Sequence, residues 1–310
     1  MRLKICFILL FFLLFLLFLS SACQAVPQNN DSTAVNEQTI VDEIGRQVKI
    51  PKSPQRIISL APSITEMLFA LELGDKVVGV TSYCNYPQAT TKIPKVSDTL
   101  HPNLEMIISL KPDLVLVTTA SQLEQFTAKM SELGIAVFVI KSDSVKGVLG
   151  SIELLGKITN KEQIAKNLID SLNARLEKVK QQHLNQPAKP KVFFIVGTEP
   201  LITVGRKAFV TDLINLAGGQ SISEDVETEW PAYSIETAIS RAPEIILSPG
   251  SHSTENEPSK LTLPKGLEVT PAARLGKIYK IDGDLLLRPG PRIIDGLEQI
   301  TKLFYPEEKH

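Results

Sequence analysis

Side chains able to bind a ligand gather at the ends of predicted strands. Three follow a strand that ends near Val80, one lies in a proline-containing loop of the second half, and two follow the last strand. These residues are Tyr83, Cys84, Tyr86, Trp230, Asp284 and Arg288. Ligands of open α/β sheets bind beyond the carboxyl ends of the strands. We therefore expect a ligand site here. Packing roles fit Trp230 and the two tyrosines about equally well. Cys84 fits the role of a small neutral packing residue better than that of a group near a bound metal.

Motifs of catalysis and of metal binding are missing from the sequence. There is no GxSxG, HExxH, CxxC or GxGxxG, and the four histidines lack metal-ligand spacing. We therefore predict no catalytic residue, no metal site and no cofactor. An envelope enzyme on a two-lobed scaffold stays as the alternative class, and it would need a nucleophile–base pair or a metal cluster that the sequence does not display.

The composition is that of a folded protein of about two domains. The chain has 310 residues, 43% of them apolar, and 33 Lys and Arg balance 34 Asp and Glu to a net charge of −1. A nucleic-acid-binding protein would show a basic excess, so this balance argues against that class.

The N-terminus reads as an export signal. Arg2 and Lys4 precede an apolar run over 5–19, which is shorter than the roughly 20 residues that a helix needs to cross a bilayer. The residues before Cys23 resemble the lipobox of bacterial lipoproteins, which implies cleavage after residue 22 and acylation of Cys23. Residues 23–38 read as a flexible tether, so we expect an exported envelope protein held by lipid on a membrane. An ordinary signal peptide or an uncleaved anchor is the alternative.

The remainder predicts two α/β lobes, over 39–143 and 185–310, joined by connector helices over 144–184. β-Rich runs alternate with helical patterns in both lobes, which favours parallel sheets flanked by helices. A hairpin turning at Gly45 is expected before the first lobe. Ser63 and Glu66 form a capping-box pattern, and Asn160 is a predicted cap of a connector helix over 161–184. The last helix is expected to begin near Pro291. The predicted strands cover 56–60, 77–80, 114–117, 136–140, 192–196, 201–204, 245–247 and 278–281.

An internal repeat gives each lobe one equivalent glutamate. The segment 103–116 recurs at 234–247, with a capping residue, a glutamate, a serine, a proline and an acid at matching offsets. Glu105 and Glu236 thus fall in the first turn of a short helix, where a carboxylate complements the helix dipole. They are either helix-start charges only or a pair that engages a two-fold partner carrying basic residues.

Three stretches of the first lobe, 56–66, 77–87 and 103–115, resemble the cobalamin- and iron-siderophore-binding proteins of ABC importers. The resemblance covers nearly the whole mature chain and implies a monomeric class III periplasmic binding protein with a long helix between its lobes. It implies that Glu105 and Glu236 meet arginines of a dimeric permease. Within the family the chain looks most like the cobalamin binders, whose ligand contacts match Tyr83, Trp230 and Asp284. Two aromatic positions of the cobalamin pocket fall near Thr99 and Thr118, so haem and ferric siderophores stay open as ligands.

Overall fold

The protein is described by a computed structural model that covers residues 37–98, 101–119, 123–250 and 262–306. The predicted signal, Cys23 and the tether up to residue 36 lie outside the described residues, as do Thr99 and His252. Among the helices that the structure describes, none is both long enough and apolar enough to cross a membrane.

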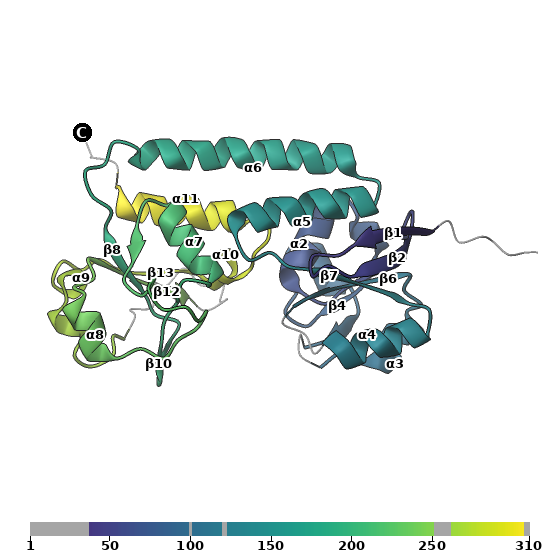
Figure 1. Ribbon diagram of the computed structural model, residues 1–310, viewed down its shortest axis with the longest axis horizontal. Helices are drawn as coiled ribbons and strands as arrows, with labels where there is room; N and C mark the ends of the chain where they lie inside the picture. Colours follow the sequence, from purple (N-terminus) through teal and green to yellow (C-terminus); the bar gives the residue numbers. More distant parts are fainter. Residues whose placement is uncertain (1–36, 99–100, 120–122, 251–261, 307–310) are drawn as a thin grey trace, which may run out of the picture. The chain divides into compact units, whose positions relative to one another are not determined.

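The first lobe is built on a five-stranded parallel sheet (Figure 1). Its strands, in spatial order, are β5 (Lys95–Ser97), β4 (Val77–Thr81), β3 (Ile57–Ser59), β6 (Leu114–Thr118) and β7 (Ala136–Ile140). The central strands are buried on both faces, which explains why they read as unbroken apolar runs. The helices of this lobe are α2 (Pro62–Ala70), α3 (Leu104–Ser109) and α4 (Leu123–Glu132). The short helical turns η2 (Gly74–Lys76) and η3 (Gln88–Lys92) flank β4.

The predicted N-terminal hairpin is present and is attached to the first sheet. Strands β1 (Glu37–Val41) and β2 (Gln47–Pro51) pair antiparallel, and Gly45 in the turn has a φ of 86°, which favours glycine. The buried Asp42 carboxylate accepts hydrogen bonds from Arg46 of the hairpin and from the backbone N–H of Val139 in β7. The hairpin is therefore fixed to the edge strand of the lobe.

The second lobe has a four-stranded parallel sheet. Its strands, in spatial order, are β11 (Gln220–Ser221), β8 (Lys191–Phe194), β12 (Ile245–Gly250) and β13 (Ile278–Asp282). Its helices are α7 (Phe209–Leu216), α8 (Ile235–Ser240), η4 (Leu267–Val269), α9 (Pro271–Arg274), α10 (Gly283–Leu287) and α11 (Ile293–Phe304). The strand predicted over 201–204 is confirmed only in its first two residues. Only β10 (Leu201–Ile202) forms there, and it pairs antiparallel with β9 (Gly197–Thr198) in a separate ribbon.

Two helices connect the sheets, α5 (Val145–Ile158) and α6 (Glu162–His183). Helix α6 has 22 residues, so it is about 33 Å long, and it packs against both α5 and α11 (Figure 1). One side of α6 is buried, through Ala165, Leu172, Leu176 and Val179.

Two predicted helix caps are absent. The N-cap of α6 is Lys161, because Asn160 has a φ of 55° and its side-chain amide donates to the Lys52 carbonyl instead. The capping-box prediction for Ser63 and Glu66 was also wrong, since α2 begins at Pro62 with Ala61 as its N-cap. Proline lacks a backbone N–H and so needs no cap there. The Glu66 carboxylate is used elsewhere, as described below.

Candidate ligand-binding cavity and docking residues

A cavity of about 430 Å³ is lined by residues from both lobes. This volume lies in the range of small-molecule sites. The first lobe contributes the segments that follow the carboxyl ends of β3, β6 and β7, which is where ligands of parallel sheets bind. The second lobe contributes the loop before α7, the loop before α8 and the segment after α10.

Two of the residues predicted from the sequence line this cavity, Trp230 and Arg288. Trp230 is 45% exposed, so its ring has area left for a ligand, and Phe209 adds a second aromatic side chain. Sequence reasoning missed the charged and hydroxyl side chains that share the lining. They include Thr119, Lys141, Asp143, Lys207 and Glu229. The first three lie just after strand ends, and that position was the available signal. Thr118, near which the resemblance places a pocket position, also lines the cavity.

The segment with the two tyrosines lies outside the cavity lining. Tyr83 is 54% exposed and Tyr86 is 47% exposed, so both rings can still meet a large ligand. Cys84 between them is only 2% exposed, and its sulfur lies 3.2 Å from the hydroxyls of Thr65 and Thr81. A thiol enclosed in this way is a packing group, so the ligand-contacting set proposed below excludes Cys84.

Asp284 and Arg288 form a network with residues of the first lobe. Arg288 Nη2 lies 2.9 Å from Asp284 Oδ1, and its Nη1 donates to the Asn85 amide oxygen at 2.6 Å. The Asn85 amide in turn donates to Asp284 Oδ2 at 3.2 Å. The Asp284 carboxylate is thus engaged by protein groups. Because Asp284 is also buried, it has little surface left for a ligand.

Glu66 joins the same network from α2. Arg292, just before α11, donates to both carboxylate oxygens of Glu66, at 2.6 and 2.9 Å, and its guanidinium stacks 4.0 Å from the centre of the Tyr86 ring. Burial of the carboxyl, which is 4% exposed, raises the pKa of Glu66, while the hydrogen bonds from Arg292 oppose that rise. No local sequence signal marks this pair, because its members are 226 positions apart.

The repeat seen in the sequence recurs as equivalent structure in both lobes. Asn103 caps α3 by accepting from the Met106 N–H at 3.0 Å, and Ser234 caps α8 by accepting from the Thr237 N–H at 3.0 Å. Both glutamates of the repeat, Glu105 and Glu236, are exposed in the first turn of these helices. Within the described part of the chain, neither carboxylate has an ion-pair partner.

In each copy of the repeat, the acidic residue that follows the proline binds the backbone at the start of the neighbouring strand. Asp113 accepts from the backbone N–H groups of Gln55 and Arg56 at 2.7 and 3.1 Å. Glu244 accepts from the backbone N–H of Lys191 at 2.9 Å. Both acids thus bind the start of the neighbouring parallel strand, and the two glutamates upstream are presented on matching scaffolds.

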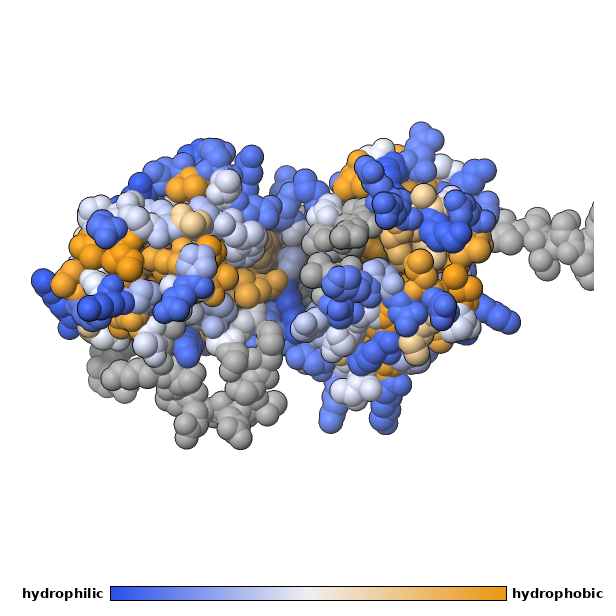
Figure 2. Space-filling model, turned by 90° about the horizontal axis from the view of Figure 1, so that it is seen from below, coloured by the Kyte–Doolittle hydropathy of each residue, from blue (hydrophilic) through white to orange (hydrophobic). Residues whose placement is uncertain are grey.

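The face that carries α3 and α8 also exposes apolar side chains. Figure 2 shows apolar patches set among hydrophilic side chains on both lobes from that side. Leu104, Met106 and Ile108 of α3 are exposed around Glu105, whereas Val269 and Leu275 are exposed in the second lobe.

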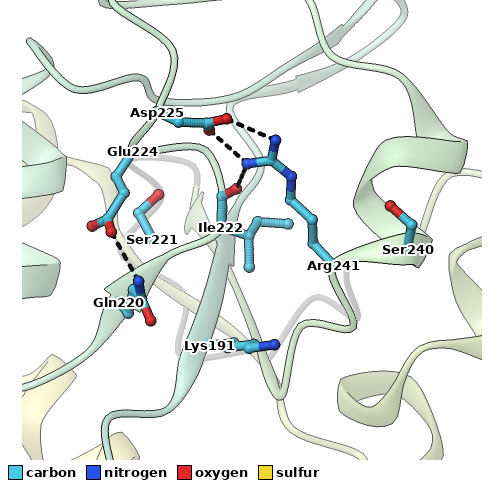
Figure 3. Close-up of a pocket in the computed structure, with 8 residues that line it drawn as sticks. All are labelled: Lys191, Gln220, Ser221, Ile222, Glu224, Asp225, Ser240 and Arg241. Carbon is cyan, nitrogen blue, oxygen red and sulfur yellow. Dashed lines mark hydrogen bonds and ion pairs between the residues drawn. The ribbon is translucent and has the colours of Figure 1, made fainter.

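A second cavity, of about 490 Å³, is lined by the start of β8, by β11 and the segment after it, and by the end of α8 (Figure 3). Arg241 makes two hydrogen bonds to the Asp225 carboxylate and another to the Ile222 carbonyl. These bonds from Arg241 lower the pKa of Asp225. Because these hydrogen bonds tie the end of α8 to the segment after β11, we treat the Arg241–Asp225 pair as structural.

Comparison with known proteins identifies the class. A model of the family described as periplasmic binding protein matches residues 57–285. The chain belongs to the periplasmic binding protein family. Members are ligand carriers, so the chain is a binding protein and not an enzyme. The expected two-lobed α/β fold of class III is confirmed by solved relatives.

Relatives with known names agree on this class. An uncharacterised ABC transporter substrate-binding lipoprotein of Bacillus subtilis is 32% identical over 92% of this chain and 91% of its own length. A vitamin B12-binding protein of Vibrio vulnificus is 32% identical over 81% of this chain and 90% of its own. This chain is therefore an exported substrate-binding protein of the ABC-importer type.

Two solved structures are similar across nearly their whole length. The vitamin B12-binding protein BtuF of Vibrio cholerae has a TM-score of 0.72 at 26% identity, over 83% of this chain and 99% of its own. The periplasmic haem-binding protein RhuT of Roseiflexus has a TM-score of 0.71 at 28% identity, over 81% and 98%. Neighbours of the same fold are thus named for two different ligands, vitamin B12 and haem.

Proposed function

We propose that this protein captures a corrinoid, such as cobalamin, between its lobes and delivers it to the permease of an ABC importer. The observation that carries the proposal is the cavity lined from both lobes with Trp230 in its wall. A corrinoid has broad apolar faces and an amide-rich edge. It therefore needs an aromatic surface for a face and a few polar groups for the edge.

The side chains around the cavity supply both kinds of contact. Trp230 and Phe209 provide aromatic surface from the second lobe, while Thr118, Thr119 and Ser142 provide hydroxyls from the first. Tyr83 and Tyr86 are exposed on a segment that Arg288, a cavity residue, binds through the Tyr83 carbonyl at 3.2 Å. These tyrosines complete the proposed ligand-contacting set.

The second candidate ligand is haem or a ferric siderophore. The observation that favours it is the pair of lysines in the cavity, Lys141 from the first lobe and Lys207 from the second. Haem propionates and siderophore carboxylates would find cationic partners there. The likeness to the haem-binding protein RhuT supports the same alternative.

Calorimetric titration with cyanocobalamin, dicyanocobinamide, haemin and a ferric siderophore separates these ligands. The proposal expects saturable binding of the corrinoids. Saturable binding of haemin or a ferric chelate, without corrinoid binding, would refute the corrinoid as the ligand. The assignment as a substrate-binding protein would be unchanged.

Docking to the permease is proposed for Glu105 and Glu236. Their exposure, the absence of any partner for either carboxylate in the described residues, and their equivalent scaffolds support a contact with two equivalent basic sites. The apolar side chains of Leu104, Met106 and Ile108 would enlarge the contact at the first lobe.

Attachment to the membrane is proposed through an acylated Cys23. The support is the sequence before Cys23 and the lipoprotein named among the relatives. Mass spectrometry of the N-terminal peptide from membrane extracts tests it, and an unmodified Cys23 would contradict it.

A further inference from the structure

Four charged side chains form a neutral cluster across the two lobes. Glu66 belongs to the first lobe, and Asp284, Arg288 and Arg292 belong to the second. Arg292 donates to the Glu66 carboxylate through Nε and Nη2, and Arg288 Nη1 lies 3.8 Å from the same carboxylate. Arg292 Nη2 is also 4.0 Å from Asp284 Oδ2. All four side chains are largely buried, so their charges interact strongly and are costly to leave unpaired.

The cluster also holds the segment that carries the tyrosines. Arg288 donates to the Tyr83 carbonyl and to the Asn85 side chain, and Asp284 accepts from Asn85. The Arg292 guanidinium, fixed by Glu66, stacks on the Tyr86 ring at 4.0 Å. Three residues of the second lobe, Asp284, Arg288 and Arg292, thus hold the segment 83–86 of the first.

The cluster adjoins the ligand cavity. Arg288 and Pro289 line the cavity from the second lobe, and Ser63, three residues before Glu66, lines it from the first. The backbones approach closely at this point, because a Cβ placed on Gly290 would be 3.4 Å from both the Ser63 Cα and Glu66 Oε2. The two lobes are therefore in close contact beside the cavity, near the point where Arg292 meets Glu66.

We propose that Glu66 and Arg292 are positioning residues for ligand binding. They fix the two lobes at the cavity and hold the Tyr83–Tyr86 segment beside it, without touching the ligand themselves. The identity of the ligand in this inference rests on the proposed function, whereas the geometry of the cluster does not depend on it. Loss of either charge removes the closest partner of the other and leaves the buried cluster with a net charge, so each single substitution loosens the lobes and the tyrosine segment together.

The test compares Glu66→Gln, Arg292→Met and the double variant with the parent. Cyanocobalamin is the probe, and the fluorescence of Trp230, the sole tryptophan, reports its release in a stopped-flow experiment. Each single variant is expected to release the probe on the order of tenfold faster. The double variant should be closer to the parent, because neither buried charge is then left alone.

The matched control is Arg175→Met. Arg175 also makes two hydrogen bonds to a carboxylate, that of Glu298, but it joins α6 to α11 and does not line the cavity. This variant should lose thermal stability and keep the release rate of the parent within twofold. A purely structural role for Glu66 and Arg292 predicts the same pattern for them, and that result would overturn the proposal.

A measurement without ligand separates this inference from the choice of ligand. Hydrogen–deuterium exchange of the peptide over 82–87 should be faster in Arg292→Met and Glu66→Gln than in the parent, and unchanged in Arg175→Met. If the parent does not bind cyanocobalamin, the proposed ligand fails while this comparison still tests the cluster. If Glu66→Gln does not fold, Glu66→Asp keeps the charge but shortens its reach, and faster exchange is again expected. Exchange equal to that of the parent in all folded variants would refute the positioning role.

Discussion

Arg175 of α6 binds Glu298 of α11 through two parallel hydrogen bonds, each 2.8 Å long. Its Nη2 also lies 2.6 Å from Asp295 Oδ1. The pair fastens the connector helix to the last helix of the second lobe. The hydrogen bonds from Arg175 lower the pKa of Glu298, so the ionised carboxylate is favoured in the folded state.

The first prediction concerns acid stability. A carboxyl whose pKa is lowered by folding stabilises the protein above its unfolded pKa, and this contribution is lost as the pH falls through the folded pKa. Arg175→Met should therefore lower the free energy of unfolding by about 1 kcal/mol at pH 7, because the pair is partly exposed. The difference from the parent should shrink below about pH 4.5. Urea unfolding at pH 7 and pH 3.5 measures it.

The control for this prediction is Lys166→Met on the same helix. Its ion pair with Asp170 is exposed, and its removal should change stability little at either pH. An Arg175→Met defect that is equally large at pH 3.5 would show that the packing of the side chain, and not the ion pair, stabilises the contact.

The second prediction concerns the thiol. Because Cys84 is 2% exposed and lies against two threonine hydroxyls, the native protein should not react at Cys84 with a thiol reagent on a timescale of minutes. The reaction should become complete in denaturant. Cys84→Ala should bind the ligand as tightly as the parent. Rapid labelling of the native protein, suppressed by ligand, would place the thiol in the site after all.

Much of the fold could be predicted from sequence because its local signals agree with its packing. The buried strands β6 and β7 read as apolar runs, the hairpin turn has its glycine at a positive φ, and the stripe of α6 faces α5 and α11. The short strands β5 and β11 were missed, because two or three residues give no periodicity.

The part of the site that could not be predicted depends on long-range pairing. The spacing of Ser63 and Glu66 matches the sequence pattern of a capping box. In the structure α2 begins at Pro62, and no side chain caps it. The partner of Glu66 is Arg292, which follows the last strand, and no spacing rule connects the two residues. Lys141 and Lys207 come from different lobes. Only the folded chain brings both into the lining of one cavity, so their spacing in the sequence could not predict it.

The third prediction tests the loop that carries Trp230. Gly205 donates its N–H to the Glu229 carbonyl at 2.9 Å, and a Cβ on Gly205 would lie 2.0 Å from the Thr228 carbonyl oxygen. Gly205→Ala should therefore displace the loop, shift the fluorescence of Trp230 and weaken ligand binding. Gly150→Ala in α5 is the control, since nothing lies within 4 Å of its Cβ, and it should leave binding unchanged. Unaltered binding and fluorescence in folded Gly205→Ala would show that the loop has no role in the site.

The fourth prediction concerns docking. Reversal of Glu105 and Glu236 to arginine should abolish import in cells and leave ligand affinity in solution unchanged, because neither residue lines the cavity. Rim charges act mainly on association rate, so higher salt should weaken docking more than ligand binding. Glu132→Arg, an exposed glutamate of α4 outside the repeat, should import normally. Normal import by the double reversal would contradict the docking role.

The central claim is that a corrinoid binds in the cavity with Trp230 in its wall, and titration calorimetry tests it most directly. The parent should bind cyanocobalamin with one site per chain. Trp230→Ala should bind it about thirtyfold more weakly, which corresponds to about 2 kcal/mol for loss of an aromatic hot spot. Tyr305→Ala, whose ring stacks on His183 away from the cavity lining, should keep the affinity of the parent. Equal affinity of the parent and Trp230→Ala, or no cyanocobalamin binding by the parent, would contradict the account.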